Sequence, residues 1–187
     1  MDQPIRVISL DRTPERFALF EKLNPGLAYE RVPACDGRLL DRARCEAEGL
    51  FAPGLRYSAG ACGSAVSHMA LWQQGMRHER VMHIAEDDAV IRPDFHAVAT
   101  AALAALPEWD IVLWSHNDNW PVGLVPAIGG LPVVLQGPPL SKLILGEGLA
   151  PFRASRQRPA LVPLHSAAGL GLDSVSPRAG CCSAACR

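Results

Sequence analysis

The stretch Ile5–Leu23 reads IRVISLDRTPERFALFEKL, and it decides the fold class. Its opening run, Ile5–Leu10, is short, apolar and rich in β-branched residues, which is typical of a buried strand. Thr13 then predicts a helix N-cap, and Pro14 suits the first helical position. Apolar residues recur at helical spacing until Asn24-Pro25-Gly26 ends the pattern. The stretch therefore predicts a strand, a short loop and a helix, the opening unit of an α/β fold.

The same alternation continues through the first 120 residues of the chain. Strands are predicted over residues 29–34, 81–85 and 110–114, and helices over residues 63–76 and 94–106. The first of these helices carries an apolar stripe at Ala65, Met69, Trp72 and Met76. Alternating strands and helices predict a mostly parallel sheet flanked by helices.

Composition narrows the class of protein. The chain has 187 residues, of which 49% are apolar and 20% are charged, as expected for a folded globular domain. Its formal net charge of −1 and the lack of a Lys/Arg-rich run argue against a nucleic-acid partner. The uncharged stretch 119–141 contains too many Pro and Gly residues for a membrane-spanning helix, and no signal peptide is readable, so a cytoplasmic chain is expected.

Cysteine spacing predicts neither a disulfide framework nor a zinc site. Cys35, Cys45 and Cys62 are scattered without a CxxC spacing, and we expect free thiols. The other three cysteines crowd the last seven residues without a fourth zinc ligand nearby.

The triplet Glu86-Asp87-Asp88 follows a predicted strand directly. Open α/β sheets usually bind ligands at the carboxyl ends of their strands. If the strand stays extended, Glu86 and Asp88 point to one side and Asp87 to the other. Three adjacent carboxylates repel one another, and oxygen ligands of this kind suit magnesium or manganese, which in turn bridges to a diphosphate. The alternative is a solvated acidic turn.

Three blocks of sequence, in this order, resemble glycosyltransferase family 25, the lipopolysaccharide galactosyltransferase family. They are VISLDRTPER (Val7–Arg16), GACGSAVSHMALWQ (Gly60–Gln73) and IAEDDAVI (Ile84–Ile91). The resemblance implies a GT-A fold and a UDP-sugar donor substrate, most often UDP-galactose. It also implies a divalent metal, manganese or magnesium, and inversion at the anomeric carbon.

The resemblance assigns site residues position by position. Asp88 would bind the metal, with Glu86 assisting it or facing the ribose. The residues implied in binding the nucleotide sugar are Asp11, Arg16, Ser67, His68 and Glu86. For Ser67 and His68, which fall on a predicted helix, local hydrogen bonds are the alternative role. The general base is unknown, and Asp118 is a candidate only as an acidic residue in a polar stretch.

Residues 1–120 are thus expected to form a nucleotide-sugar-binding α/β domain, and residues 121–187 a Pro/Gly-rich continuation with an incomplete acceptor side. The stretch His165–Arg178 is faintly similar to a later family block, Gly-Thr-x-x-Tyr-x-x-Ser-Pro, without its tyrosine. Residues after Gly171 show no periodic apolar face, so we expect them to add little to the core, and we expect a truncated C-terminus to weaken transfer.

The sequence accordingly predicts transfer of a sugar, galactose by resemblance, to a cell-envelope glycan such as lipopolysaccharide, with peripheral contact with the inner membrane. Two alternatives stay open. One is a catalytically silent remnant that binds the nucleotide sugar, and the other is a metal-dependent phosphohydrolase that uses the same acidic triplet.

Overall fold

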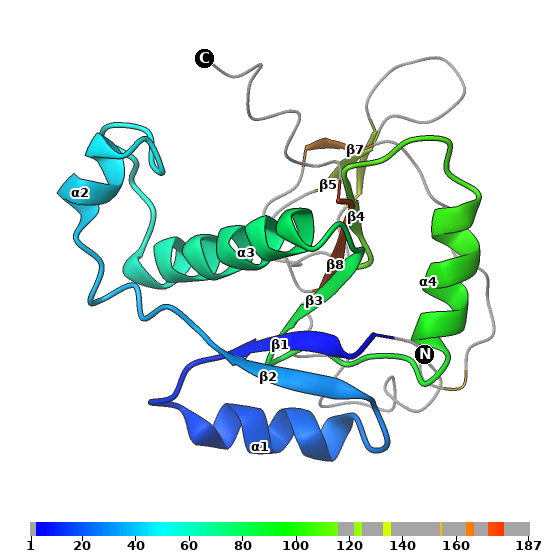
Figure 1. Ribbon diagram of the computed structural model, residues 1–187. Helices are drawn as coiled ribbons and strands as arrows, with labels where there is room; N and C mark the ends of the chain where they lie inside the picture. The colour runs from blue at the N-terminus through cyan, green and yellow to red at the C-terminus, as the bar shows by residue number, and fades with distance from the viewer. Residues whose placement is uncertain are drawn as a thin grey trace.

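The computed structural model describes residues 3–115, 122–124, 133–135, 154, 164–166 and 172–177 (Figure 1). The elements of the first half are β1 (Ile5–Ser9), α1 (Pro14–Leu23), β2 (Tyr29–Pro33), α2 (Arg42–Ala47), α3 (Ala59–Arg77), β3 (Met82–Glu86), α4 (Phe95–Ala104) and β4 (Ile111–Leu113). They are followed by β5 (Val122–Leu124), β6 (Val133–Leu135), β7 (Leu164–Ser166) and β8 (Leu172–Val175). The predicted opening unit is confirmed, with Thr13 at the N-cap of α1 and Asn24 at its C-cap.

The main sheet has five strands in the order β2-β1-β3-β8-β4. Strand β1 pairs in parallel with β2 and with β3, so that Val7 lies beside Arg31 on one side and Ala85 on the other. Strand β8 is antiparallel to both β3 and β4. The prediction of a mostly parallel sheet is therefore correct for the β1–β3 half, and the whole sheet is mixed. A smaller antiparallel sheet has the order β6-β5-β7.

Helices cover both faces of the main sheet, as predicted. On one face, Phe20 of α1 and Phe95 of α4 pack against Val7 and Ala85. On the other face, Leu71 of α3 packs in a cluster with sheet residues of β1, β3 and β8. Figure 1 shows α1 and α3 on opposite sides of the strands. Because both faces are covered, most residues of β1 and of β3 are buried.

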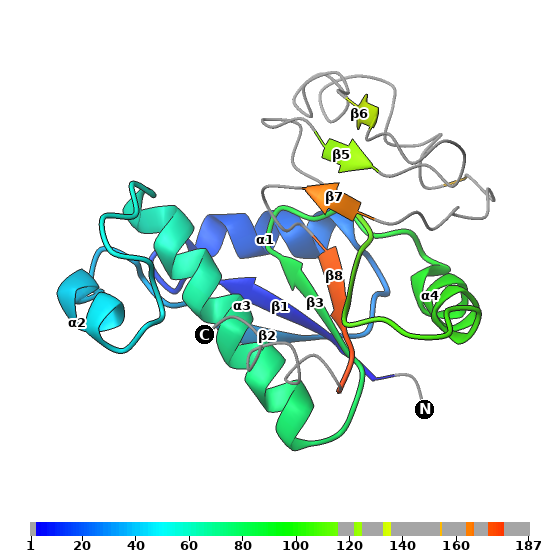
Figure 2. The same ribbon diagram turned by 90° about the horizontal axis from the view of Figure 1, so that it is seen from above.

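Strand β8 corrects the expectation that residues after Gly171 add little to the core. Its four residues are all buried, and Val175 pairs with Met82 on β3 and with Ile111 on β4. Figure 2 shows β8 beside β3, within the main sheet. The segment LDSV has no apolar alternation, because both of its faces are buried and two of its buried side chains are polar. A search for a periodic apolar face therefore misses it.

Helix α3 begins at Ala59, earlier than predicted, with the Ser58 hydroxyl accepting a hydrogen bond from the backbone N–H of Ala61 at 3.2 Å. Its buried side is also not the predicted stripe, whose four residues are only partly buried. The buried residues are Cys62, Gly63, Ser67, His68, Leu71 and Gly75. This face contains polar side chains because charged groups of the sheet lie opposite them, as described below.

Gly63 lies inside α3 at a close contact between backbones. A Cβ atom on Gly63 would lie 2.5 Å from the carbonyl oxygen of Cys35 and 2.6 Å from the backbone nitrogen of Gly37. Only glycine allows the loop after β2 to approach the helix this closely. The sequence predicts the helix to begin at Gly63, whereas the structure places Gly63 inside α3 with a packing role.

Helix α2 was not predicted. It is short and begins after Asp41, whose side chain accepts from the backbone N–H of Arg44. Cys45 of α2 and Phe51, which follows the helix, pack against Cys62 of α3. Cys35, Cys45 and Cys62 are free thiols, as expected. The cysteines of the last seven residues lie outside the described part of the chain. Within the described residues, no helix is both long and apolar enough to cross a bilayer.

Candidate functional site

The acidic triplet lies where strand β3 ends. β3 stops at Glu86, and the chain turns at once, because the backbone N–H of Ala89 donates to the carbonyl oxygen of Glu86 at 3.1 Å. The strand therefore does not stay extended through the triplet, and the alternation expected for an extended strand is wrong. The turn gives the three carboxylates different environments. Since β1, β2 and β3 run in parallel, the loops that follow them meet at the same edge of the sheet.

Asp87 is the buried member of the triplet, with a side chain only 6% exposed. Its carboxylate accepts hydrogen bonds from the Ser9 hydroxyl at 2.8 Å, from Arg16 Nε at 2.8 Å and from Arg16 Nη2 at 2.6 Å. These contacts join the end of β1 and the first turn of α1 to the end of β3. A buried carboxylate with three donors is fully satisfied, so Asp87 acts as an anchor of the turn.

Asp88 is the exposed member, with 58% of its side chain accessible. Its carboxylate lies 3.2 Å from Arg16 Nη2. Partial loss of hydration at this edge of the sheet raises the pKa of Asp88, and the nearby charge of Glu86 raises it further against the opposing effect of Arg16. The ionised form of Asp88 is thus disfavoured in the folded protein, and a cation bound here would relieve the repulsion.

The turn is also held on its far side by Asn24, the C-cap of α1. The Asn24 side-chain amide donates to the carbonyl oxygens of Phe20 at 2.9 Å and Ala89 at 3.0 Å. Its oxygen accepts from the backbone N–H of Ile91 at 2.7 Å. Asn24 is buried, and these bonds attach the residues after the triplet to the end of α1.

Asp11 lies just past the end of β1, at the same edge as the triplet, and its carboxylate pairs with Arg31 of β2 at 2.6 Å. Next to it in sequence, Arg12 pairs with Asp36 at 2.9 Å, and Arg38 pairs with the same carboxylate at 2.7 Å. The Arg38 hydrogen bonds, assisted by Arg12, hold the pKa of Asp36 well below its usual range. Sequence reasoning missed these arginines, because single cations in loops carry no spacing signal.

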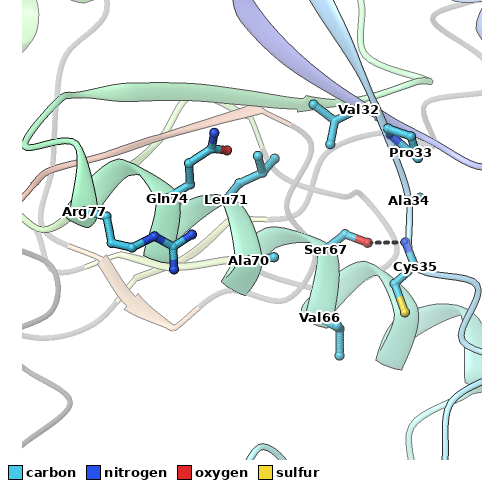
Figure 3. A pocket seen from close by; sticks show the side chains of 10 residues that line it. All are labelled: Val32, Pro33, Ala34, Cys35, Val66, Ser67, Ala70, Leu71, Gln74 and Arg77. Carbon is cyan, nitrogen blue, oxygen red and sulfur yellow. Dashed lines mark hydrogen bonds between the residues drawn. The ribbon is translucent and has the colours of Figure 1, made fainter.

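Ser67 makes two hydrogen bonds to the backbone. Its hydroxyl donates to the carbonyl oxygen of Gly63 and accepts from the N–H of Cys35, both at 2.8 Å. Figure 3 shows the hydrogen bond between Ser67 and Cys35, at the edge of a groove between the end of β2 and helix α3. The groove has a volume of about 440 Å³. Neither Asp11, Arg16 nor any residue of the triplet lines that groove. The contacts of Ser67 are those of a residue that holds the loop after β2 onto α3.

His68 is 1% exposed and lies between two carboxylates. Its Nε2 is 3.5 Å from Glu86 Oε1, and its Nδ1 is 3.3 Å from Asp173 Oδ1, both within ion-pair distance but without good hydrogen-bond geometry. Burial lowers the pKa of His68, but Asp173 and then Glu86 outweigh it and raise the pKa to about 9. The two carboxylates therefore favour the protonated form of the ring. Glu86 also accepts from the Ser64 hydroxyl at 2.6 Å.

Asp173 was not predicted as a site residue. It is 0% exposed on β8, and its Oδ2 accepts a hydrogen bond from Trp72 Nε1 at 3.1 Å. The sequence signal that could have indicated Asp173 is an acidic residue within a short segment, LDSV, whose other residues are small or apolar. That signal has meaning only once the segment is known to be a buried strand.

The carboxylates of the triplet fit a small divalent cation in part. Among the described residues, no group of three or more His, Cys, Asp or Glu side chains surrounds a common point. Magnesium, however, is usually held by one or two protein carboxylates together with substrate phosphates and water. Exposed Asp88 and partly exposed Glu86 match that smaller set of ligands. Asp118, the candidate base, lies outside the described residues.

The fold is that of an α/β protein with an acidic edge of the sheet, and open α/β sheets usually bind ligands at this kind of edge. A family model described as glycosyltransferase family 25 (LPS biosynthesis protein) matches residues 2–120. The chain belongs to this family, and the suspected resemblance is confirmed. The family supports a glycosyltransferase of lipopolysaccharide biosynthesis, with a sugar donor and a glycan acceptor. No curated protein matches the chain.

Proposed function

We propose that this protein transfers a sugar, galactose, from a UDP-sugar to a cell-envelope glycan such as lipopolysaccharide. We further propose that the reaction inverts the anomeric carbon, depends on manganese or magnesium, and takes place on a GT-A fold. The observation that carries the metal site is the exposed Asp88 carboxylate at the carboxyl end of β3, beside Glu86 and the Arg16 guanidinium. Ligands of open α/β sheets bind at such edges.

In this proposal, Asp88 and Glu86 hold the metal. When bound, the metal offsets the negative charge that builds on the diphosphate as UDP leaves. The raised pKa of Asp88 supports this assignment, because a carboxylate that is partly desolvated and lies near Glu86 gains from a bound cation. Asp87, in contrast, is already satisfied by Ser9 and Arg16.

Arg16 and Asp11 take the nucleotide part of the substrate. Arg16 is 49% exposed, and its contacts with the triplet use Nε and Nη2 of a guanidinium that has five N–H donors. It is thus suited to meet a phosphate oxygen while it stays anchored to Asp87. Asp11 is exposed at the end of β1, in a place suited to the ribose or uracil. His68 faces Glu86 from inside the protein, and Ser67 holds the loop after β2 onto α3.

Inversion also needs a base that removes the proton of the acceptor hydroxyl as it attacks. None of the residues described above has a contact that singles it out for this role. Asp118 remains the candidate, and its replacement by Asn should lower the transfer rate while UDP binding is kept.

Titration calorimetry of UDP, with and without Mn²⁺, tests the proposed site. Asp88→Ala should lose the Mn²⁺-dependent part of UDP binding, because it removes the exposed carboxylate of the metal pair. Glu48→Gln, which removes an exposed charge at the end of α2, is the matched control and should bind as the wild type does. Equal Mn²⁺-dependent affinity in wild type and Asp88→Ala would refute the metal assignment.

Turnover separates the proposed transferase from its two alternatives. UDP release from UDP-galactose that depends on a lipopolysaccharide acceptor extract supports the transferase. Binding of UDP without turnover identifies a silent nucleotide-sugar-binding protein. Release of inorganic phosphate without any acceptor identifies a phosphohydrolase.

A further inference from the structure

A buried polar chain runs from the centre of the sheet to the acidic edge, and it includes a residue outside the matched family region. Trp72 of α3 donates to Asp173 of β8, whose other carboxylate oxygen faces His68. The opposite nitrogen of His68 faces Glu86, the last residue of β3. The family match ends at residue 120, so Asp173 lies beyond it.

The burial of Asp173 calls for a physical explanation. Its side chain is 0% exposed in a central strand, where an ionised carboxylate is costly unless charge and hydrogen bonds compensate it. The indole N–H of Trp72 at 3.1 Å and the His68 ring at 3.3 Å provide that compensation. Asp173 thus occupies a site built around its charge.

His68 is buried between two carboxylates. The ring is 1% exposed, and each of its nitrogens faces a carboxylate oxygen. Asp173 fixes the ring from the side of the core, and the ring in turn contacts the Oε1 atom of Glu86. The Ser64 hydroxyl holds the same Oε1 atom at 2.6 Å. Two groups therefore orient the Glu86 carboxylate, the Ser64 hydroxyl and the His68 ring, and the other side of that ring faces Asp173.

We propose that Asp173 is a positioning residue of the metal and nucleotide-sugar site, which acts through the His68 ring on the Glu86 carboxylate. This inference rests on the proposed function, because it assigns Asp173 a role at the site formed by Glu86 and Asp88. Outer partners of metal ligands commonly contribute in this way, by fixing the orientation of the ligand.

The test measures the Mn²⁺-dependent affinity for UDP by titration calorimetry in Asp173→Asn, which keeps the shape of the side chain and removes its charge. We expect affinity to fall about tenfold, at the low end of the effect of losing an outer partner of a metal ligand. Ser174→Ala is the matched control. Ser174 is the neighbouring residue of β8, is also 0% exposed, and bonds to His83 at 2.6 Å and Trp114 at 2.7 Å, away from the triplet.

Thermal melts of both variants separate positioning from loss of stability. Asp173→Asn should lower the affinity for UDP by more than its change in melting temperature would suggest. Ser174→Ala should lower the melting temperature and keep the affinity within about twofold. If Asp173→Asn and Ser174→Ala are equally destabilised and lose equal affinity for UDP, the inference is overturned. If Asp173→Asn does not fold, Trp72→Phe removes the bond to the other oxygen of Asp173 and serves as the milder variant, with a smaller loss of affinity expected.

A double-mutant cycle tests the route through His68. In a His68→Gln background, Asp173→Asn should cause no further loss of Mn²⁺-dependent affinity, because the connecting ring is gone. Additive losses would overturn the proposed route. If the wild type shows no Mn²⁺-dependent UDP binding, the proposed function fails. If the wild type binds UDP with Mn²⁺ and Asp173→Asn binds equally well, this inference fails while the proposed function stands.

Discussion

Asp87 and Asp88 are neighbours with the same side chain and opposite surroundings. Asp87 is 6% exposed and accepts three hydrogen bonds, whereas Asp88 is 58% exposed and lies at 3.2 Å from one guanidinium nitrogen. Burial and hydrogen bonding make the first residue important for stability, and exposure makes the second accessible to a ligand. A sequence pattern cannot separate them, because the difference arises from the turn at Glu86.

This contrast predicts opposite effects of two alanine substitutions. Asp87→Ala leaves the buried Ser9 hydroxyl and one side of Arg16 without partners, and should cost about 2 kcal/mol in the free energy of unfolding. Asp88→Ala should change it by less than about 0.5 kcal/mol, as is usual for an exposed position. Urea unfolding curves of the two variants measure both values. If the two substitutions lower the free energy of unfolding by similar amounts, Asp87 does not anchor the turn as described.

At the scale of elements, α3 shows how a helix can be predicted correctly and oriented wrongly. The apolar stripe of Ala65, Met69, Trp72 and Met76 is only partly buried, and the sheet-facing side contains Ser67 and His68 instead. The predicted strands and helices of the first half exist, because their apolar runs and caps are local signals. The buried face of α3 depends on Asp173, helix α2 packs on Cys62 of α3, and strand β8 depends on β3 and β4. Local patterns do not report these partners.

Two glycines of α3 provide a matched pair. Gly63→Ala should destabilise the protein, because its Cβ would lie 2.5 Å from the carbonyl oxygen of Cys35, although alanine favours helix formation. At Gly60 the nearest atom to a new Cβ is the Ser58 hydroxyl oxygen at 3.9 Å. Gly60→Ala should therefore stabilise the protein by up to about 1 kcal/mol. Thermal melts of the two variants check the sign of each change, and a stabilised Gly63→Ala would contradict the close packing.

At the scale of the whole molecule, the sheet is closed by a strand from far along the chain. β8 separates β3 from β4, and its Asp173 meets His68 of α3 and, through it, Glu86 of β3. The acidic triplet and Arg16 could be predicted from sequence as parts of a site, because they lie within the blocks that resemble the family. The part that Asp173 plays behind them could not, since it depends on contacts among three separated elements.

This network predicts a stability that depends on pH. The pKa of His68 is about 9 in the folded protein and about 6.5 when unfolded, so its contribution is fully present below pH 6.5 and is lost as pH rises through 9. The groups that face the ring are Asp173 from β8 and Glu86 from β3. The free energy of unfolding should fall between pH 6.5 and pH 9, by roughly 3 kcal/mol at most.

Urea unfolding at pH 6 and at pH 9.5 measures this dependence. His68→Gln, which cannot be protonated in this range, should lose most of the difference between the two pH values. His78→Gln is the control, because His78 is exposed at the C-cap of α3, and it should keep the dependence. If the His68→Gln protein keeps the full pH dependence of the wild type, then groups other than His68 cause that dependence.

The attachment of the acidic turn to both ends of α1 has a consequence for ligand binding. Arg16, in the first turn of α1, holds Asp87, and Asn24, at its C-cap, holds Ala89 and Ile91. The two anchors are eight residues apart along a helix, a rigid span of about 12 Å. Asp88 sits between these fixed points, so its backbone is already ordered before a substrate arrives. Little conformational entropy is then lost on binding, and more of the interaction energy appears as affinity.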